Sequence, residues 1–418
     1  MAITINSSPI GGQYITMAHN PVEFVVTSSN KTQTNFRYIA DLYWNGATQP
    51  IRFQMGVDPT YGSCRFDFSS VVRNLVTYNP PIVRVNDFYD CPDSYQTITV
   101  KFGEQYGASS ALTNYVNLTT FSMKVWNASL PIDRWWNAGN PTSDYVVGEY
   151  RKKFLTDVPN SQSNPYKICT TDYHYLYFLQ DGQNDPVHHV TVETYRADGT
   201  LIQSVTWDDT FTQASAVQRI GVGYANLLNC GGETNFSGTL PVVSSSVDTY
   251  SVQLFNSDEE PTALTKKFWF KVECECTWET PYRLCFLNKL GGYDFFNFNW
   301  NSKKTSTYEK SNFQSKIWDF NSNGTGINYN SYRRGKTTYS TIGSDKLQLT
   351  SGWITEEQST WLEELISSPD VYIIDAQGFL TAVTVTDTQY DYKTLEYDEL
   401  FNLTVNLEFA YSRYRQAL

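Results

Sequence analysis

The chain has 418 residues, and its 31 Lys and Arg against 43 Asp and Glu give a formal net charge of −12. Proteins that bind nucleic acid need clustered positive side chains to displace counterions from phosphates, so this balance argues against sequence-specific nucleic-acid binding. The sequence contains no apolar run of the ~20 residues needed to span a bilayer. Its start lacks the basic and apolar regions of a signal peptide, so we expect no membrane span and folding in a cytoplasm.

The aromatic content is the most informative feature of the composition. The chain has 30 Tyr, 24 Phe and 11 Trp, while charged residues make up only 18%. Aromatic and β-branched side chains suit pleated, half-buried surfaces, whereas Asn, Gly and Ser suit turns. We therefore predict a mainly β protein. The length suggests two to four domains, and the chain divides into three segments, each predicted to be a domain of β-sandwich or barrel type.

The predicted N-terminal β domain covers residues 1–134. In the run 35–44, apolar side chains fall on alternate positions, which is the period of a half-buried strand. Asn45-Gly46 follows directly and predicts a hairpin, with 50–55 as the return strand. Residues 69–76 have apolar side chains at helical spacing after a serine cap and predict a short helix.

The middle domain, residues 135–275, is predicted to be an immunoglobulin-like β-sandwich. Its short apolar runs follow one another about every ten residues, with turns such as Asp198-Gly199 between them. Because no Cys–Trp–Cys spacing marks a true immunoglobulin domain, only the architecture is inferred. The predicted strands are 173–179, 190–195, 201–207, 249–255 and 267–272.

The C-terminal domain, residues 276–418, is predicted to contain strands and one short helix packed on them. Two apolar runs meet at Gly291-Gly292, which predicts a hairpin. The helix is placed at 355–366, because Thr355-Glu-Glu-Gln358 is a capping box and an apolar stripe follows it. The Asn- and Tyr-rich span 299–345 is expected to form strands and extended loops.

The four histidines do not suggest a metal site. His188 and His189 are adjacent, so on a strand their side chains point to opposite faces and cannot chelate one ion together. His19 and His174 have no Cys or His partner at ligand spacing. We therefore interpret all four as surface or core histidines.

Cysteine and acidic clusters are the other candidates for a metal site. Cys274-x-Cys276 with Cys285 lacks the second pair that a zinc site needs, and the seven scattered cysteines fit a reducing compartment. Asp87–Asp93 and Asp181–Asp185 lack the terminal Glu of a calcium loop, which leaves a weak calcium site at either segment open. No catalytic motif occurs. We expect a non-enzymatic protein without catalytic residues, metal or cofactor.

Several stretches resemble virion proteins of tailed phages that infect Bacteroides-type bacteria, a group that includes the neck and tail ring proteins of crAss-like phages. The first is Asn35-Phe-Arg-Tyr-Ile-Ala-Asp-Leu-Tyr-Trp-Asn-Gly46, followed by Phe66-Asp-Phe-Ser-Ser-Val-Val-Arg73. Phe286-Leu-Asn-Lys-Leu-Gly-Gly-Tyr-Asp-Phe-Phe-Asn-Phe298 is similar to the same group, as are Ser367–Asp375 and Leu400–Tyr411. These motifs cover parts of the first and third predicted domains only.

The resemblance implies a structural protein of the virion, assembled in the host cytoplasm. Such a protein forms a cyclic homo-oligomeric ring of the neck or tail, joins the portal to the distal tail and surrounds the DNA channel. Its partners would be the portal and other neck or tail proteins. Two alternatives stay open: a tail protein whose β-sandwich binds host receptors or glycans, and a glycan-degrading tail enzyme.

Candidate interface residues lie at two places in the chain. Trp135 and Trp136 stand in a polar linker, where either a neighbouring subunit or the two adjoining domains could bury them. The basic and aromatic C-terminus could bind an acidic neighbour through Tyr411, Arg413, Tyr414 and Arg415, or could fray.

Overall fold

The computed structural model describes residues 3–9, 15–82, 88–108, 111–112, 116–137, 143–147, 152–180, 187–208, 216–230, 236–256, 261–273, 281–329, 331–332, 334–389 and 402–414. Strands account for 50% of the chain and helices for 8%, which confirms the prediction of a mainly β protein. The chain divides into two compact units. Unit 1 is Met1–Cys274 with Leu287–Asp294 and Ala376–Gly378, and unit 2 is Glu275–Phe286, Phe295–Asp375 and Phe379–Leu418. The three domain boundaries drawn from the sequence stay predictions.

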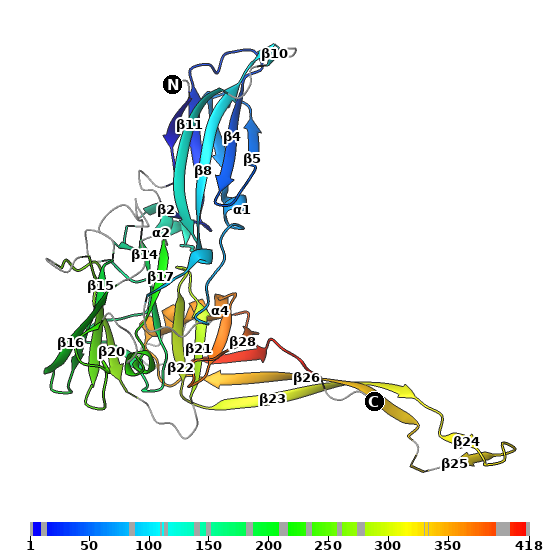
Figure 1. The fold of residues 1–418 in the computed structure, drawn as a ribbon. Coiled ribbons are helices and arrows are strands. Elements are labelled where there is room, and N and C mark those ends of the chain that lie inside the picture. The colour runs from blue at the N-terminus through cyan, green and yellow to red at the C-terminus, as the bar shows by residue number, and fades with distance from the viewer. Residues whose placement is uncertain are drawn as a thin grey trace. The chain divides into compact units, whose positions relative to one another are not determined.

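The first part of unit 1 is a β-sandwich of a three-stranded sheet, β1-β3-β6, and a five-stranded sheet, β2-β11-β8-β4-β5. Figure 1 shows β4, β8 and β11 side by side. A small sheet pairs β9 with β10. The elements are β1 (Ile3–Ser7), β2 (Ile15–Met17), β3 (Glu23–Ser28), β4 (Arg37–Trp44), β5 (Ile51–Met55), β6 (Ser63–Asp67), α1 (Ser69–Val72), β8 (Tyr95–Gln105), β9 (Gly107–Ala108), β10 (Ala111–Leu112) and β11 (Val116–Trp126).

The core of this sandwich is aromatic, as the composition predicts. Phe24 of β3 packs against Phe68 and Phe102, with ring centroids 5.7 and 5.2 Å away. The predicted hairpin is confirmed: β4 and β5 pair antiparallel around the turn at Gly46, whose φ of +84° favours glycine. The predicted short helix is confirmed as α1.

The second part of unit 1 contains a four-stranded sheet, β12-β14-β17-β7, and a six-stranded sheet, β13-β20-β19-β15-β16-β18. All five strands predicted for the middle segment are present, as β14, β15, β16, β19 and β20. The elements are β7 (Phe88–Asp90), η1 (Pro92–Ser94), α2 (Ile132–Asn137), β12 (Val146–Val147), β13 (Tyr166–Ile168), β14 (Tyr175–Gln180), β15 (His189–Tyr195), β16 (Leu201–Asp208), β17 (Val217–Gly221), α3 (Tyr224–Leu228), β18 (Phe236–Ser237), β19 (Thr249–Phe255) and β20 (Phe268–Val272).

Long-range pairing links this part of unit 1 to the chain before residue 134. Strand β7 pairs with β17, and buried Gln218 accepts a hydrogen bond from Gln180 and donates one to Asp90. Tyr250 of β19 is fully buried and donates to the carbonyl of Val222, just after β17, at 2.9 Å. These bonds satisfy buried polar groups, which specifies how the strands pair.

Unit 2 is built on an eight-stranded sheet in the order β22-β21-β27-β28-β29-β26-β23, with β30 also paired to β26. Strands β21 and β22 are neighbours, which confirms the hairpin predicted at Gly291-Gly292. The elements are β21 (Tyr282–Leu287), β22 (Tyr293–Phe298), β23 (Ser302–Gln314), β24 (Trp318–Phe320), β25 (Ile327–Tyr329), β26 (Lys336–Thr350), α4 (Glu356–Ser367), β27 (Val371–Ile374), β28 (Leu380–Val385), β29 (Thr404–Phe409) and β30 (Arg413–Tyr414).

Helix α4 confirms the prediction of a short helix packed on strands. Its capping box is formed. The Thr355 hydroxyl accepts a hydrogen bond from the backbone amide of Gln358 at 3.3 Å, and the side-chain oxygen of Gln358 accepts one from the backbone amide of Thr355 at 3.1 Å. Trp361 and Leu365 are buried, and the Trp361 ring lies 5.7 Å from Phe286 of β21. Burial of this apolar stripe against the sheet stabilises a helix too short to form alone.

Candidate functional site

The most conspicuous exposed feature is a two-stranded ribbon in unit 2, defined here as residues 302–350. Strands β23 and β26 run antiparallel over 13 residue pairs, and Figure 1 shows them side by side. The smaller pair β24 and β25 lies between them in sequence. This ribbon accounts for most of the span 299–345, for which the sequence predicted only strands and extended loops.

Both edges of the ribbon are open over long stretches. Strand β23 is the last strand of its sheet, and every residue after Ser302 is exposed. On the other side, β29 covers only Lys346–Thr350 of β26, and β30 pairs only with Ile342 and Gly343. Among the described residues, Lys336–Thr338 and Ser340–Thr341 pair with β23 alone. Such free backbone donors and acceptors are a template for a further strand.

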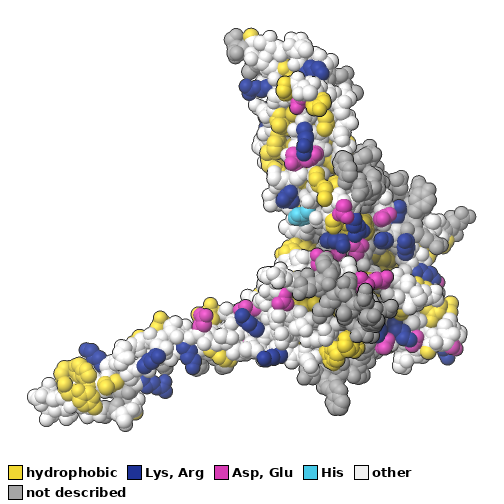
Figure 2. Space-filling model, turned by 180° about the vertical axis from the view of Figure 1, so that it is seen from behind, with side chains coloured by type: hydrophobic (Ala, Val, Ile, Leu, Met, Phe, Trp, Pro, Cys, Tyr) yellow, Lys and Arg dark blue, Asp and Glu magenta, His cyan; other side chains and the backbone are white. Residues whose placement is uncertain are grey.

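The ribbon also exposes many large apolar side chains. It contains eight of the 22 exposed large apolar residues in the described parts of the chain, although it is only 49 residues long. Figure 2 shows a hydrophobic cluster at its far end. Trp318 and Phe320 contact each other there, with ring centroids 5.7 Å apart. The eight residues are Tyr308, Phe313, Ile317, Phe320, Ile327, Tyr329, Tyr332 and Tyr339.

The charge of the ribbon is opposite to that of the rest of the chain. Residues 302–350 contain eight Lys and Arg and three Asp and Glu, which gives a formal net charge of +5. Because the whole chain has a net charge of −12, the remaining residues have a net charge of −17. Figure 2 shows the positive side chains spread along the ribbon. The charge difference can be read from the sequence. It indicates an interaction surface only because the segment is an exposed ribbon, and the sequence did not predict that.

The C-terminal candidate residues lie beside the base of the ribbon. Tyr411 and Tyr414 are exposed, with exposed fractions of 51% and 77%. Arg413, however, forms an ion pair with buried Asp345 of β26 and contacts the Ser306 hydroxyl at 3.2 Å. The C-terminal segment up to Tyr414 is therefore a short strand held within its own unit rather than a frayed end, and binding to an acidic neighbour stays a prediction. Arg415 lies outside the described residues.

Asp345 is the centre of this small electrostatic cluster. Its carboxylate accepts a hydrogen bond from Ser306 at 2.6 Å and lies 3.4 Å from the Lys304 ammonium. The Ser306 hydrogen bond, followed by the Arg413 guanidinium, lowers the pKa of Asp345 below its usual range.

The other candidate pair lies on α2. Trp135 is 9% exposed, so most of its indole is already packed within unit 1. The low exposure of Trp135 agrees with burial by its own chain, which was one of the two alternatives given for this residue. The Trp136 side chain lies outside the described residues.

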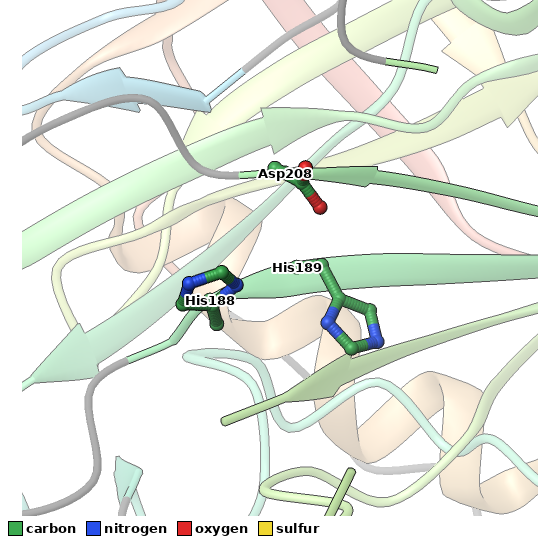
Figure 3. Close-up of side chains that lie close together, drawn as sticks. All are labelled: His188, His189 and Asp208. Carbon is green, nitrogen blue, oxygen red and sulfur yellow. The ribbon is translucent and has the colours of Figure 1, made fainter. Parts of the chain in front are cut away.

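The structure corrects the prediction for His188 and His189. Strand β15 begins at His189, so strand alternation does not apply to His188. With Asp208 of β16, the two histidines form a group whose candidate ligand atoms lie within 4.8 Å of one another. Figure 3 shows the three side chains at the adjacent ends of β15 and β16. The sequence does not show that β15 begins at His189, and the prediction depended on that residue.

The remaining metal candidates are less favourable. Asp90 accepts a hydrogen bond from Gln218, and Asp93 accepts one from Asn79. Both carboxylates therefore already form hydrogen bonds within the protein. Asp87 and Asp181–Asp185 lie outside the described residues, and a calcium site there stays a prediction.

One cysteine departs from the expectation of reduced thiols. Cys169 is disulfide-bonded, whereas the other described cysteines, Cys64, Cys91, Cys230 and Cys285, are free and buried. Cys274 and Cys276 lie outside the described residues. Burial raises the pKa of the Cys64 thiol to about 11, which makes it a poor nucleophile near neutral pH.

Comparisons with known proteins assign no family to the chain. No family model matches it, and no curated protein matches it. Among solved structures, a marsupial T cell receptor aligns over 83% of this chain and 96% of its own, at 8% identity and a TM-score of 0.19. A likeness at that score carries no argument about fold or function. Among the described residues, no helix is long and apolar enough to cross a membrane.

Proposed function

We propose that this protein is a structural subunit of a phage virion, which assembles into an oligomeric ring of the neck or tail. The ring would lie between portal and distal tail around the DNA channel. The observation that supports assembly is the ribbon, with its open edges, exposed apolar side chains and positive charge. The virion context comes from the resemblance of residues 35–46 and 286–298 to virion proteins. A non-enzymatic role is part of the same proposal.

The low intrinsic stability of the ribbon favours assembly. A two-stranded β-ribbon in water is marginally stable by itself, and strands of 13 and 15 residues exceed the usual length. A neighbouring copy that adds a strand to either open edge would satisfy its free backbone groups. It would also bury exposed aromatic side chains, which commonly dominate the binding energy of an interface.

The ribbon and the rest of the chain also have complementary charges. The ribbon carries +5 and the rest of the chain −17, so a ribbon lying on the neighbouring copy brings opposite charges together. This contact joins two different surfaces and is therefore heterologous. Repeated around an axis, heterologous contacts close into a ring when the rotation allows it. High salt is expected to weaken the assembly, because screening acts on exposed charges.

The test measures the oligomeric state of the full chain by analytical ultracentrifugation and negative-stain electron microscopy at low and high salt. Wild type should form closed cyclic oligomers, favoured at low salt. The triple variant Phe320→Ser, Ile327→Ser, Tyr329→Ser should remain monomeric, because it removes three side chains of the exposed cluster that are 64%, 58% and 67% exposed.

A matched control removes three apolar side chains of comparable exposure outside the ribbon: Tyr61→Ser, Ile82→Ser and Ile132→Ser. This control should assemble as wild type does. The proposal fails if wild type stays monomeric at every salt concentration, alone or with portal protein, and labelling of particles places the chain only at the distal tail tip.

A second candidate function is glycan binding, and one observation favours it. Trp300 and Trp353 are 39% and 61% exposed and contact each other, with ring centroids 5.2 Å apart. The two rings meet edge to face at 61°, so each exposed indole face offers its own apolar surface on which a sugar ring can pack. A glycan array distinguishes the two functions: Trp353→Ala should abolish glycan binding if this is the role, and should leave ring formation unchanged.

A further inference from the structure

We propose that His188, His189 and Asp208 bind one divalent transition-metal ion of the Zn²⁺ type at the end of the six-stranded sheet in unit 1. The candidate ligand atoms, one per side chain, lie within 4.8 Å of one another. Figure 3 shows the three side chains. This inference does not depend on ring assembly. It concerns unit 1, whereas the ribbon belongs to unit 2.

Strand register places two of the three ligands together. His189 of β15 is directly opposite Asp208 of β16, and residues opposite each other on one face have Cβ atoms about 5 Å apart. The next pair, Val190 and Trp207, is buried in the core. Because successive residues alternate between faces, His189 and Asp208 share the face that points away from that core.

Neighbouring residues hold the His189 imidazole and the His188 backbone before any ion binds. The Phe255 ring of β19 stacks on His189 at a centroid distance of 5.2 Å and an angle of 8°. The backbone amide of His188 donates to the Phe255 carbonyl at 2.8 Å. The two imidazole planes are nearly perpendicular, at 82°. Ligands that are already held lose less freedom on binding, which favours affinity.

The donor set indicates the class of ion. Two neutral imidazole nitrogens and one carboxylate oxygen are typical ligands of Zn²⁺ and similar borderline ions, whereas Ca²⁺ requires six to eight oxygen ligands. With metal–ligand bonds of about 2.0–2.1 Å, tetrahedral ligands lie roughly 3.4 Å apart. His188 and Asp208 are solvent-accessible, so small side-chain rotations can close the present separation. Three protein ligands leave the fourth position for water.

The experiment titrates untagged full-length protein, first stripped with a chelator, with Co²⁺ and then displaces Co²⁺ with Zn²⁺. Wild type should bind one Co²⁺ with the visible absorption of a tetrahedral ion, and Zn²⁺ should displace it. Each of His188→Ala, His189→Gln and Asp208→Asn should weaken binding by at least roughly tenfold. The melting temperature of wild type, but not of these variants, should rise with Zn²⁺.

The matched control is His19→Gln, which removes an exposed histidine that lies 2.9 Å from Asn127 in another part of unit 1. It should bind metal as wild type does. Melting of all variants in chelator shows whether each is folded, and the accessible His188 and Asp208 allow substitution without disturbing the core. The proposal is overturned if wild type binds no Co²⁺ or Zn²⁺, or if the folded His188 and Asp208 variants bind as wild type does.

Discussion

Arg413 and Asp345 form an ion pair across 68 residues of sequence, and this pair attaches the C-terminal strand β30 to the base of the ribbon. Asp345 is buried, and its pKa is lowered, first by the Ser306 hydrogen bond and then by Arg413. A carboxylate with a depressed folded-state pKa stabilises the fold above its ordinary pKa, and that contribution is lost as the pH falls through the lowered value. The attachment of β30 should therefore weaken in acid.

Asp345→Asn is expected to release β30 at neutral pH. It removes the charge that holds Arg413, so backbone amides at 342–343 and 413–414 should exchange faster in hydrogen-exchange mass spectrometry. Trypsin should also cleave more rapidly after Arg413. Glu309→Gln, which neutralises an exposed acid on the same ribbon, is the control and should change neither rate. Wild-type exchange at 413–414 in Asp345→Asn would contradict this account.

A second ion cluster should govern the acid stability of unit 1. Asp157 is largely buried and lies 2.8 Å from the Lys289 ammonium and 3.1 Å from the Arg134 guanidinium. Burial alone would raise the pKa of Asp157, but the two cations outweigh it and lower the pKa. The cluster therefore stabilises unit 1 above the ordinary carboxyl pKa, and this contribution disappears as the pH falls through the lowered pKa.

Asp157→Asn should cost about 2 kcal/mol near neutral pH, because it leaves two cations with a neutral partner. The difference from wild type should shrink in acid, where the wild-type carboxylate is protonated. Urea unfolding of wild type and variant between neutral pH and pH ~3 measures this convergence. Asp133→Asn, an exposed acid on α2, serves as control. Parallel pH curves for wild type and Asp157→Asn would refute the prediction.

Two glycines with the same backbone conformation should respond differently to alanine. Gly291 and Gly46 have φ values of +83° and +84°, so both substitutions strain the backbone by about 1 kcal/mol. At Gly291 a Cβ would also lie 2.2 Å from the Asn127 carbonyl oxygen, whereas at Gly46 nothing lies within 4 Å. We expect Gly291→Ala to cost roughly 3 kcal/mol and Gly46→Ala roughly 1 kcal/mol in urea unfolding. Equal losses would contradict the proposed clash.

Local signals in the sequence were sufficient for much of the fold. The alternation over residues 35–44, the Asn45-Gly46 turn and the capping box at Thr355 each depend on neighbouring residues, and each element is present. Long-range pairing was not accessible in the same way. Strand β7 lies in the first predicted domain but pairs with β17, more than a hundred residues later, and no local pattern specifies that partner.

The candidate sites were less predictable, for two physical reasons. The ribbon has polar, exposed residues on both faces of β23, so it lacks the alternation that a half-buried strand displays. The His188 and His189 interpretation assumed that both residues lie on one strand, whereas β15 starts between them. Asp208, the third member of that group, is brought in by cross-strand register, which a single sequence does not reveal.

The capping box of α4 offers a final test of how local chemistry stabilises unit 2. Thr355→Ala removes the hydroxyl that accepts from the Gln358 amide and leaves that donor without its cap, so we expect a loss of about 1 kcal/mol. Thr360→Ala on the same helix removes only a hydroxyl that donates to the Glu356 carbonyl, which is already a helix acceptor, and should be nearly neutral. Because the chain has 11 Trp, its fluorescence does not isolate Trp361, and hydrogen-exchange mass spectrometry of peptides within 356–367 in urea measures the unfolding of this helix instead. A loss for Thr355→Ala no larger than that for Thr360→Ala would show that packing of Trp361 and Leu365, rather than the cap, determines the stability of α4.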